Sequence, residues 1–184
     1  MEKKEVPVFY PKTTRQWRNW LEKQHQKCES VWVVFHTKAS GNKSLTWSEA
    51  VDEALCFGWI DSKKIKINES ESRQFFSKRK PKSTWSKINK QKVERLAAAG
   101  RMSAAGWQII EIARQNGWWN LLDEVEELIV PDDLKVAFSK NKKAHAFYET
   151  LPRSRKKFLL QQLVLARTPE TRKKRIAAIM AQAG

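Results

Sequence analysis

The 184-residue chain contains only two cysteines, six glycines and six prolines. Chains rich in cysteine are often held together by disulfides, and chains rich in glycine and proline are often fibrous or disordered. Cys28 and Cys56 form no Cys-x-x-Cys pair, and each lies among apolar residues with helical spacing, which is typical of a buried, reduced thiol. The low glycine and proline content excludes a fibrous or disordered chain. No apolar run approaches the roughly 20 residues of a membrane-spanning helix. Reduced thiols, and a mixed-charge start without the apolar segment of a signal peptide, predict a cytoplasmic protein.

Signatures of catalysis and of metal or nucleotide binding are also missing from the sequence. His25, His36 and His145 are far apart, and none has a second ligand at a spacing that would aim both at one ion. The sequence contains no Gly-x-Ser-x-Gly elbow, Walker loop or Gly-x-Gly-x-x-Gly turn. Asp61 is the one carboxylate of interest, and the cations that follow it favour a fixed anion in an ion pair over a proton shuttle. We therefore predict no catalytic residue, no metal and no cofactor, and a binding protein rather than an enzyme.

Carboxylates are scarce relative to cations, and the formal net charge is +16. The excess is concentrated in two blocks that an acidic block separates. Residues 63–101 carry thirteen Lys or Arg against three Glu, and residues 135–175 carry thirteen against two acidic side chains. Residues 102–134, between them, carry one Arg against seven carboxylates. Such a patterned field attracts polyanions, so nucleic acid is the alternative partner to a small anion or an acidic protein.

The middle of the first basic block interleaves cations with aromatic rings and hydroxyls, and no carboxylate lies between Glu71 and Glu94. Ser83 is expected to cap a helix, whose free N–H groups would lie among cations and form an anion site. We predict a groove between a hairpin over 59–80 and this helix, although a hydrated basic surface explains the same pattern. The residues predicted to bind the ligand are Trp59, Asp61, Arg79, Lys80, Lys82, Ser83, Trp85, Ser86 and Asn89.

Hydrophobic periodicity predicts two parts of the chain. Residues 1–100 are expected to form an α+β domain and residues 101–184 an all-helical module. In the second part, Ser103 and Thr168 have the form of helix caps. Because no low-complexity linker separates the two parts, we expect them to pack together.

The first part is predicted to contain a small antiparallel sheet with covering helices. Thr13 and Thr46 begin two amphipathic helices with capping-box spacing. Residues 31–37 are apolar on both faces, as a central strand is. Residues 59–67 and 73–80 are expected to pair as a hairpin.

Four blocks of sequence carry a likeness to a known family, and together they span most of the chain. They are residues 49–62, residues 79–90, Gly100-Arg101-Met102 with Ala105-Gly106, and the stretch from Val130 to Ile176. In these blocks the chain resembles the YdeI/OmpD-associated family, often labelled bacteriocin-protection proteins. Where the family often has Thr-Pro, this chain has Ser77-Lys78, which adds a cation at the end of a strand.

The resemblance implies an N-terminal part similar to the YjbR/CyaY-like fold, followed by a helical module. It also implies a role in envelope stress and protection from antimicrobial peptides, and it supplies no catalytic residue. Our leading hypothesis is a non-enzymatic stress or protection protein that binds an anionic ligand or acidic partner through the predicted groove. A nucleic-acid-binding protein is the second hypothesis, and an enzyme of unknown type around Asp61 is the third.

Overall fold

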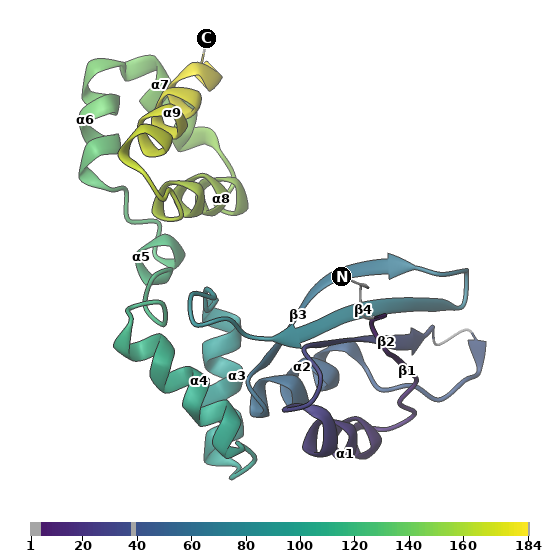
Figure 1. The fold of residues 1–184 in the computed structure, drawn as a ribbon. Helices are drawn as coiled ribbons and strands as arrows, with labels where there is room; N and C mark the ends of the chain where they lie inside the picture. Colours follow the sequence, from purple (N-terminus) through teal and green to yellow (C-terminus); the bar gives the residue numbers. More distant parts are fainter. Residues whose placement is uncertain (1–4, 38–39, 184) are drawn as a thin grey trace. The chain divides into compact units, whose positions relative to one another are not determined.

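The computed structural model describes residues 5–37 and 40–183 (Figure 1). The chain divides into two compact units, each of which is described by itself below. The first unit comprises residues 1–83 and 88–118. The second comprises residues 84–87 and 119–184.

A four-stranded sheet forms the centre of the first unit, in the order β1-β2-β4-β3. Its strands are β1 (Val8–Phe9), β2 (Ser30–His36), β3 (Trp59–Lys66) and β4 (Glu71–Lys78). The β2–β4 and β4–β3 pairs are antiparallel, as predicted, whereas β1 pairs with β2 in parallel. The predicted α+β class is confirmed, but the sheet is mixed rather than wholly antiparallel. The two residues of β1 are too few for periodicity to reveal a strand.

Two helices, α1 (Thr14–Gln24) and α2 (Trp47–Cys56), cover one face of this sheet (Figure 1). Thr13 caps α1 by accepting the N–H of the third residue beyond it. Thr46 and Glu49 form the predicted capping box of α2. These local bonds satisfy backbone donors that would otherwise lack a partner at each helix start.

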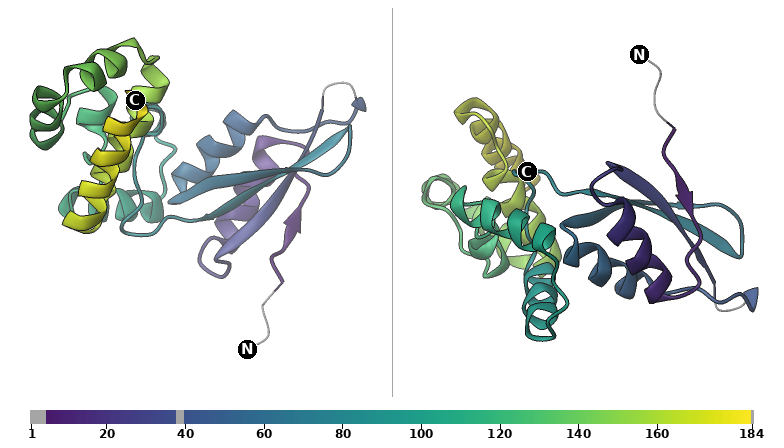
Figure 2. Two further views of the ribbon diagram at one scale, coloured as in Figure 1. Left: turned by 90° about the horizontal axis from the view of Figure 1, so that it is seen from above. Right: turned by 60° about the horizontal axis from the view of Figure 1, so that its bottom comes forward.

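The core of the first unit lies between these helices and the sheet. Trp17 of α1 packs against Phe76 of β4, with ring centroids 5.5 Å apart, and its indole N–H donates to the carbonyl of Ala50 at 3.0 Å. Seen from above in Figure 2, both helices lie on the far side of the strands. Among the described residues, the opposite face of the sheet therefore has no helix of the first unit over it.

Two buried carboxylates on α2 bind cations from other elements of the first unit. Asp52 is 8% exposed and Glu53 is 1% exposed. Their ion-pair partners are Arg18 and Arg101 for Glu53, and Lys92 and Arg95 for Asp52. Removing one partner of a buried ion pair leaves an unpaired charge in a medium of low dielectric constant, which is unfavourable. These pairs therefore favour the packing of α2 against the elements that carry its four cationic partners.

Helices α3 (Lys87–Ala98) and α4 (Ala104–Gln115) follow the sheet in the chain. The helix predicted to begin at Ser83 begins instead at Lys87. The prediction is wrong because Ser83 lies beyond a turn, in which its N–H donates to the carbonyl of Lys80 at 2.9 Å. The predicted cap of α4 is confirmed, since Ser103 Oγ accepts the N–H of Gly106 at 3.2 Å.

The second unit is helical, as predicted. Its helices are α5 (Asp123–Glu126), α6 (Asp132–Lys140), α7 (Lys142–Thr150), α8 (Arg153–Val164), α9 (Pro169–Met180) and the 3₁₀ helix η2 (Ala181–Ala183). Leu134, Tyr148, Leu160 and Leu163 are among the buried residues of its core, and Thr168 caps α9 as predicted. None of the helices in the described ranges is long and apolar enough to cross a membrane.

Candidate functional site

The nine residues of the predicted groove are shared between the two units. Trp59, Asp61, Arg79, Lys80, Lys82, Ser83 and Asn89 belong to the first unit, and Trp85 and Ser86 belong to the second. In the second unit Trp85 is buried and its ring lies 4.8 Å from that of Trp119. In the first unit Lys80 and Lys82 are exposed. A single groove that holds all nine residues stays a prediction.

Trp59 and Arg79 line one hollow of the first unit, with a volume of about 280 Å³, which we call the Trp59 hollow. Its lining residues are His25, Gln26, Phe57, Gly58, Trp59, Lys78, Arg79, Ala105, Gln108 and Ile109. A second hollow of about 460 Å³ shares His25, Gln26, Ala105 and Gln108 with it. The two hollows therefore adjoin, between the end of α1 and the first turns of α4.

Glycines allow α4 to approach the α2–β3 junction and so form one wall of the Trp59 hollow. Gly58 ends α2 with φ of +73°, and a Cβ there would lie 2.9 Å from Ile109 Cγ2. A Cβ on Gly106 would lie 2.2 Å from the carbonyl oxygen of Cys56. Trp59, the first residue of β3, faces the helices and meets the ring of Trp20 edge-on at 5.8 Å.

Arg79 supplies a buried cation to this hollow. The side chain is 5% exposed, and the backbone N–H donates to the carbonyl of Gly58 at 2.9 Å. Burial lowers the pKa of the guanidinium to about 9, and the charge of Asp61 opposes that shift. The group therefore remains cationic at neutral pH, in a setting where water screens its charge weakly.

Lys78 adds a second cation at the edge of the Trp59 hollow. Its Nζ donates to Glu29 Oε1 at 2.7 Å and to the carbonyl of Gln26 at 3.1 Å. Glu29 is exposed, so solvent weakens this ion pair. His25 lies at the rim, where its Nδ1 is 2.8 Å from the carbonyl of Leu21.

Asp61 lies outside the lining of the Trp59 hollow and is held by two side-chain donors. Its Oδ2 accepts from Trp47 Nε1 at 2.9 Å and from Gln74 Nε2 at 3.0 Å. Gln74 is buried, so this bond fixes the carboxylate against β4. A carboxylate held in this way is suited to balance a nearby cation.

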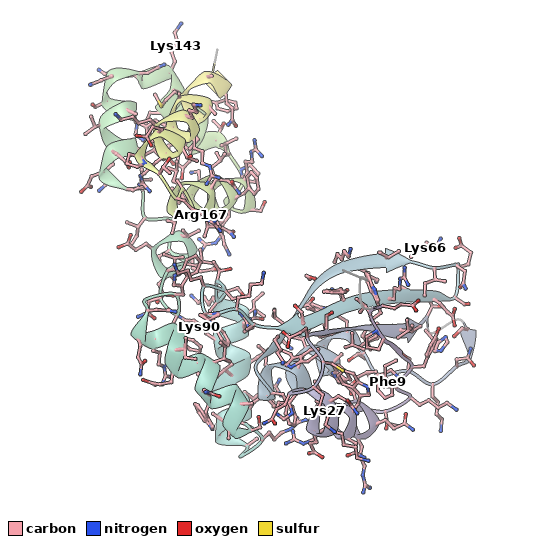
Figure 3. All side chains as sticks on the ribbon, in the orientation of Figure 1. Phe9, Lys27, Lys66, Lys90, Lys143 and Arg167 are labelled. Atoms are coloured by element: carbon pink, nitrogen blue, oxygen red, sulfur yellow. The ribbon has the colours of Figure 1, made fainter. Side chains whose placement is uncertain are left out.

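Many cations of the basic block 63–101 form structural ion pairs within their own unit. At least six do so: Lys66, Lys78, Lys87, Lys92, Arg95 and Arg101. Figure 3 shows Lys66 on the β3–β4 hairpin, where it pairs with Glu69. The sequence alone does not reveal this pairing, because most of the partner carboxylates lie outside the block.

Cys56 has the features of a structural thiol. It is fully buried, and burial raises its pKa, with the nearby charge of Glu53 acting in the same direction. This direction agrees with the prediction of an unreactive side chain at the end of a helix. Within the described ranges, no three His, Cys, Asp or Glu side chains are grouped so that they could hold a metal ion.

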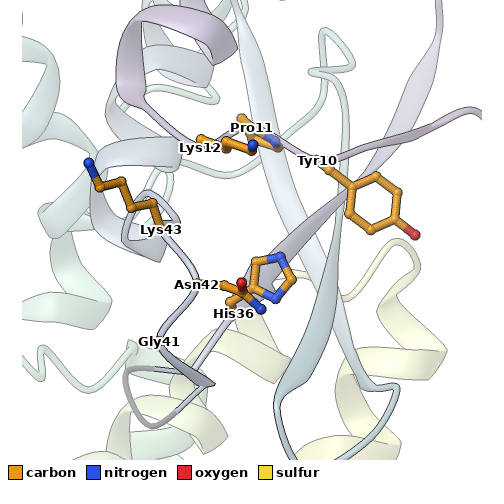
Figure 4. Close-up of a pocket in the computed structure, with 7 residues that line it drawn as sticks. All are labelled: Tyr10, Pro11, Lys12, His36, Gly41, Asn42 and Lys43. Carbon is orange, nitrogen blue, oxygen red and sulfur yellow. The ribbon is translucent and has the colours of Figure 1, made fainter.

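A separate hollow of about 280 Å³ lies at the other end of the sheet (Figure 4). It is lined by Tyr10, Pro11, Lys12, His36, Gly41, Asn42 and Lys43. His36 Nδ1 lies 3.4 Å from Glu71 Oε1, so a carboxylate already faces this histidine. The hollow holds none of the residues predicted to bind a ligand.

Sequence reasoning missed His25 and Gln108 as lining residues of the Trp59 hollow. His25 follows the last turn of α1, and Gln108 lies in α4, more than eighty residues later. Only the packing of α4 against the α2–β3 junction brings them together. Gly58 and Gly106 are the one sequence feature that could have indicated the close approach of α4 to the α2–β3 junction.

Two family models match the chain. Residues 9–109, more than half of the chain, match the model described as Domain of unknown function (DUF8412). Residues 127–184 match the model described as Bacteriocin-protection, YdeI or OmpD-Associated. No curated protein and no solved structure matches the chain, so the likeness of residues 1–100 to the YjbR/CyaY fold stays a prediction. The chain belongs to the DUF8412 family and carries, over residues 127–184, a domain of the bacteriocin-protection, YdeI or OmpD-associated family.

Proposed function

We propose that the chain is a non-enzymatic protection protein that binds a small anionic ligand in the Trp59 hollow. The match of residues 127–184 to the bacteriocin-protection family supports the biological role. The chemistry of the first unit supports the mode of action. Binding, rather than bond cleavage, is what a hollow lined by cations, amides and aromatic rings is suited to do.

The observation that carries the proposal is the buried guanidinium of Arg79 in the wall of the hollow. A cation that is 5% exposed has lost most of its hydration, and this burial lowers the pKa of the guanidinium. An anion that enters the hollow interacts with it through a medium of low dielectric constant. Charge-assisted hydrogen bonds to Arg are stronger than neutral ones, so carboxylate and phosphate groups are the chemistry that this wall favours.

The remaining lining indicates which kind of anion would bind. Phe57, Trp59 and Ile109 contribute apolar surface, whereas Gln26 and Gln108 contribute amide donors and acceptors. Together the two adjoining hollows have the size of a small-molecule site. We therefore expect a ligand with one carboxylate or phosphate and an apolar portion, rather than a bare inorganic ion.

The test introduces a negative charge at the hollow without disturbing its buried wall. Gln108 is exposed, so Gln108→Glu is expected to fold normally. A unit charge about 5 Å from a bound anion costs about 1–3 kcal/mol, which weakens binding at least fivefold. Gln91→Glu is the matched control, because Gln91 is exposed on α3 and lines none of the hollows described above.

Two measurements decide the outcome. Calorimetric titration with phenyl phosphate and benzoate compares the wild type with both variants. Survival of bacteria that express each variant, under challenge with a bacteriocin, compares their protection. Loss of binding and protection in Gln108→Glu alone supports the proposal. Equal behaviour of the two variants in both assays, or no binding of either probe by the wild type, overturns it.

A further inference from the structure

The face of the sheet opposite α1 and α2 carries a cluster of rings and cations. Residues paired across antiparallel strands lie on one face, so Trp32 and Phe75 share a face, and Val34 and Arg73 share the same one. This face is opposite to Phe76, which packs against α1. Figures 1 and 2 show no helix of the first unit over this face.

Two cations lie over the rings of this cluster. The Trp32 and Phe75 ring centroids are 5.0 Å apart, edge to face. Arg73 Cζ lies 4.5 Å from the Trp32 ring centroid. Lys63 Nζ lies 5.3 Å from the Trp32 ring and 5.8 Å from the Phe75 ring. We call Trp32, Lys63, Arg73 and Phe75 the open-face cluster.

A β-bulge places Lys63 on this face. The register passes from Asp61 opposite Phe76 to Lys64 opposite Gln74, so two residues of β3 stand opposite Phe75 alone. The buried side chain of Gln74 donates to the carbonyl of Ser62, inside the bulge, at 3.0 Å. Strict alternation would direct the residue after Ser62 toward the helices, and the bulge redirects it toward the rings.

Both cations of the open-face cluster are available to an anion. Within the ranges that the structure describes, neither Lys63 nor Arg73 forms an ion pair with a carboxylate, unlike many cations of the basic block. The Nε–H of Arg73 is buried and has no hydrogen-bond partner among the described groups. An arginine whose guanidinium lies over one indole ring can still offer its other side and its remaining N–H groups to a ligand.

We propose that the open-face cluster binds single-stranded nucleic acid. A single strand presents phosphates and unpaired flat bases together, which matches cations interleaved with rings on one surface. Bases can stack on the outer plane of the Arg73 guanidinium and on the ring of Phe75, while Lys63 binds a phosphate. Duplex DNA keeps its bases stacked inside the helix, so it would use only the charges of this face. The surface is distinct from the Trp59 hollow, so this inference stands independently of the proposed function.

The test measures binding of a fluorescein-labelled oligo(dT) strand by anisotropy between 50 and 200 mM salt. Lys63→Gln is expected to lower the salt slope by about 0.7, the value for one phosphate contact on a single strand. Phe75→Leu is expected to weaken binding roughly fivefold or more with an unchanged slope, because it removes stacking and no charge. Lys64→Gln is the matched control, since Lys64 has the same charge but pairs with Gln74 on the other face.

Each outcome decides for or against the proposal. Effects of Lys63→Gln and Phe75→Leu on the single strand, with Lys64→Gln near the wild type, support it. Equal weakening by Lys64→Gln and Lys63→Gln overturns it, because binding would then follow net charge. Absence of binding at 50 mM salt overturns it, as does duplex binding of equal affinity that Phe75→Leu leaves unchanged. Self-association of the chain that Lys63→Gln abolishes would assign this face to a second copy instead.

Discussion

Gly106→Ala is expected to destabilise the first unit, although alanine is the better helix former. Gly106 lies in α4 where that helix meets the end of α2. A Cβ there would lie 2.2 Å from the carbonyl oxygen of Cys56 and 2.8 Å from its carbonyl carbon. Both neighbours are backbone atoms, which rotamer changes cannot move, so α4 must shift by about 1 Å to regain ordinary contact.

The magnitude follows from three contributions. Overpacking of a close contact costs about 1–3 kcal/mol. The shift also strains the bonds from Ser103 to the carbonyl of Cys56, at 2.7 Å from Oγ and 3.0 Å from the backbone N–H, which contribute about 1 kcal/mol each. Alanine returns about 1 kcal/mol of helix propensity. We expect a net loss of about 2–4 kcal/mol in the free energy of unfolding.

Urea unfolding followed by far-ultraviolet circular dichroism measures this loss, with separate transitions fitted if the two units unfold separately. Gly117→Ala is the comparison, because Gly117 has φ of +78° but open space around it. It should cost only the roughly 1–2 kcal/mol of a left-handed alanine. A Gly106→Ala variant as stable as the wild type would refute the close approach of α4 to α2, and with it the wall of the Trp59 hollow.

Three further predictions concern charge and burial. Glu53→Gln should lower the free energy of unfolding by about 1–3 kcal/mol in urea titrations, because two arginines lose their buried counter-ion while keeping partial access to water. Tyr148→Phe should leave thermal stability unchanged or raise it, because the buried hydroxyl has no partner among the described groups and burial raises its pKa to about 12. A large loss of thermal stability would contradict this, because it would mean that the hydroxyl forms a hydrogen bond in the folded protein. The hydrogen bonds from Arg172 lower the pKa of Asp133, so the stability they provide is present above the unfolded-state pKa and is lost as pH falls through the folded-state pKa. The stability difference between the wild type and Asp133→Asn should therefore shrink between pH 6 and pH 2, and a constant difference would contradict the pairing.

Elements set by local chemistry could be predicted from the sequence. Thr46 and Glu49 form their capping box, and Ser103 and Thr168 cap α4 and α9, because each cap depends on residues within one turn. The hairpin also forms as predicted, and the alternation that indicated it lies at the end of β3, in Lys64-Ile65-Lys66. The predicted start at Ser83 was wrong, because the N–H of Ser83 closes a turn onto the carbonyl of Lys80 and the helix begins only at Lys87.

Features that depend on distant contacts could not be predicted. The bulge opposite Phe75 depends on the side chain of Gln74, which no spacing rule connects to Ser62. Trp59 and Arg79 were expected in one site and line one hollow, but His25 enters it through tertiary packing alone. The excess of cations in residues 63–101 overstated the free positive surface, because acidic groups elsewhere in the chain neutralise many of them.

The parallel strand β1 has a practical consequence for any shortened version of the chain. Val8 and Phe9 shield the outer hydrogen-bonding groups of β2, a strand whose five middle residues are all buried and apolar. Removing them would expose unpaired backbone N–H and C=O groups of β2 near Trp32 and Val33. Proteins aggregate through exposed strand edges of this kind. Truncated proteins used to study the first unit should therefore retain these two residues, and a solubility tag should be attached ahead of them.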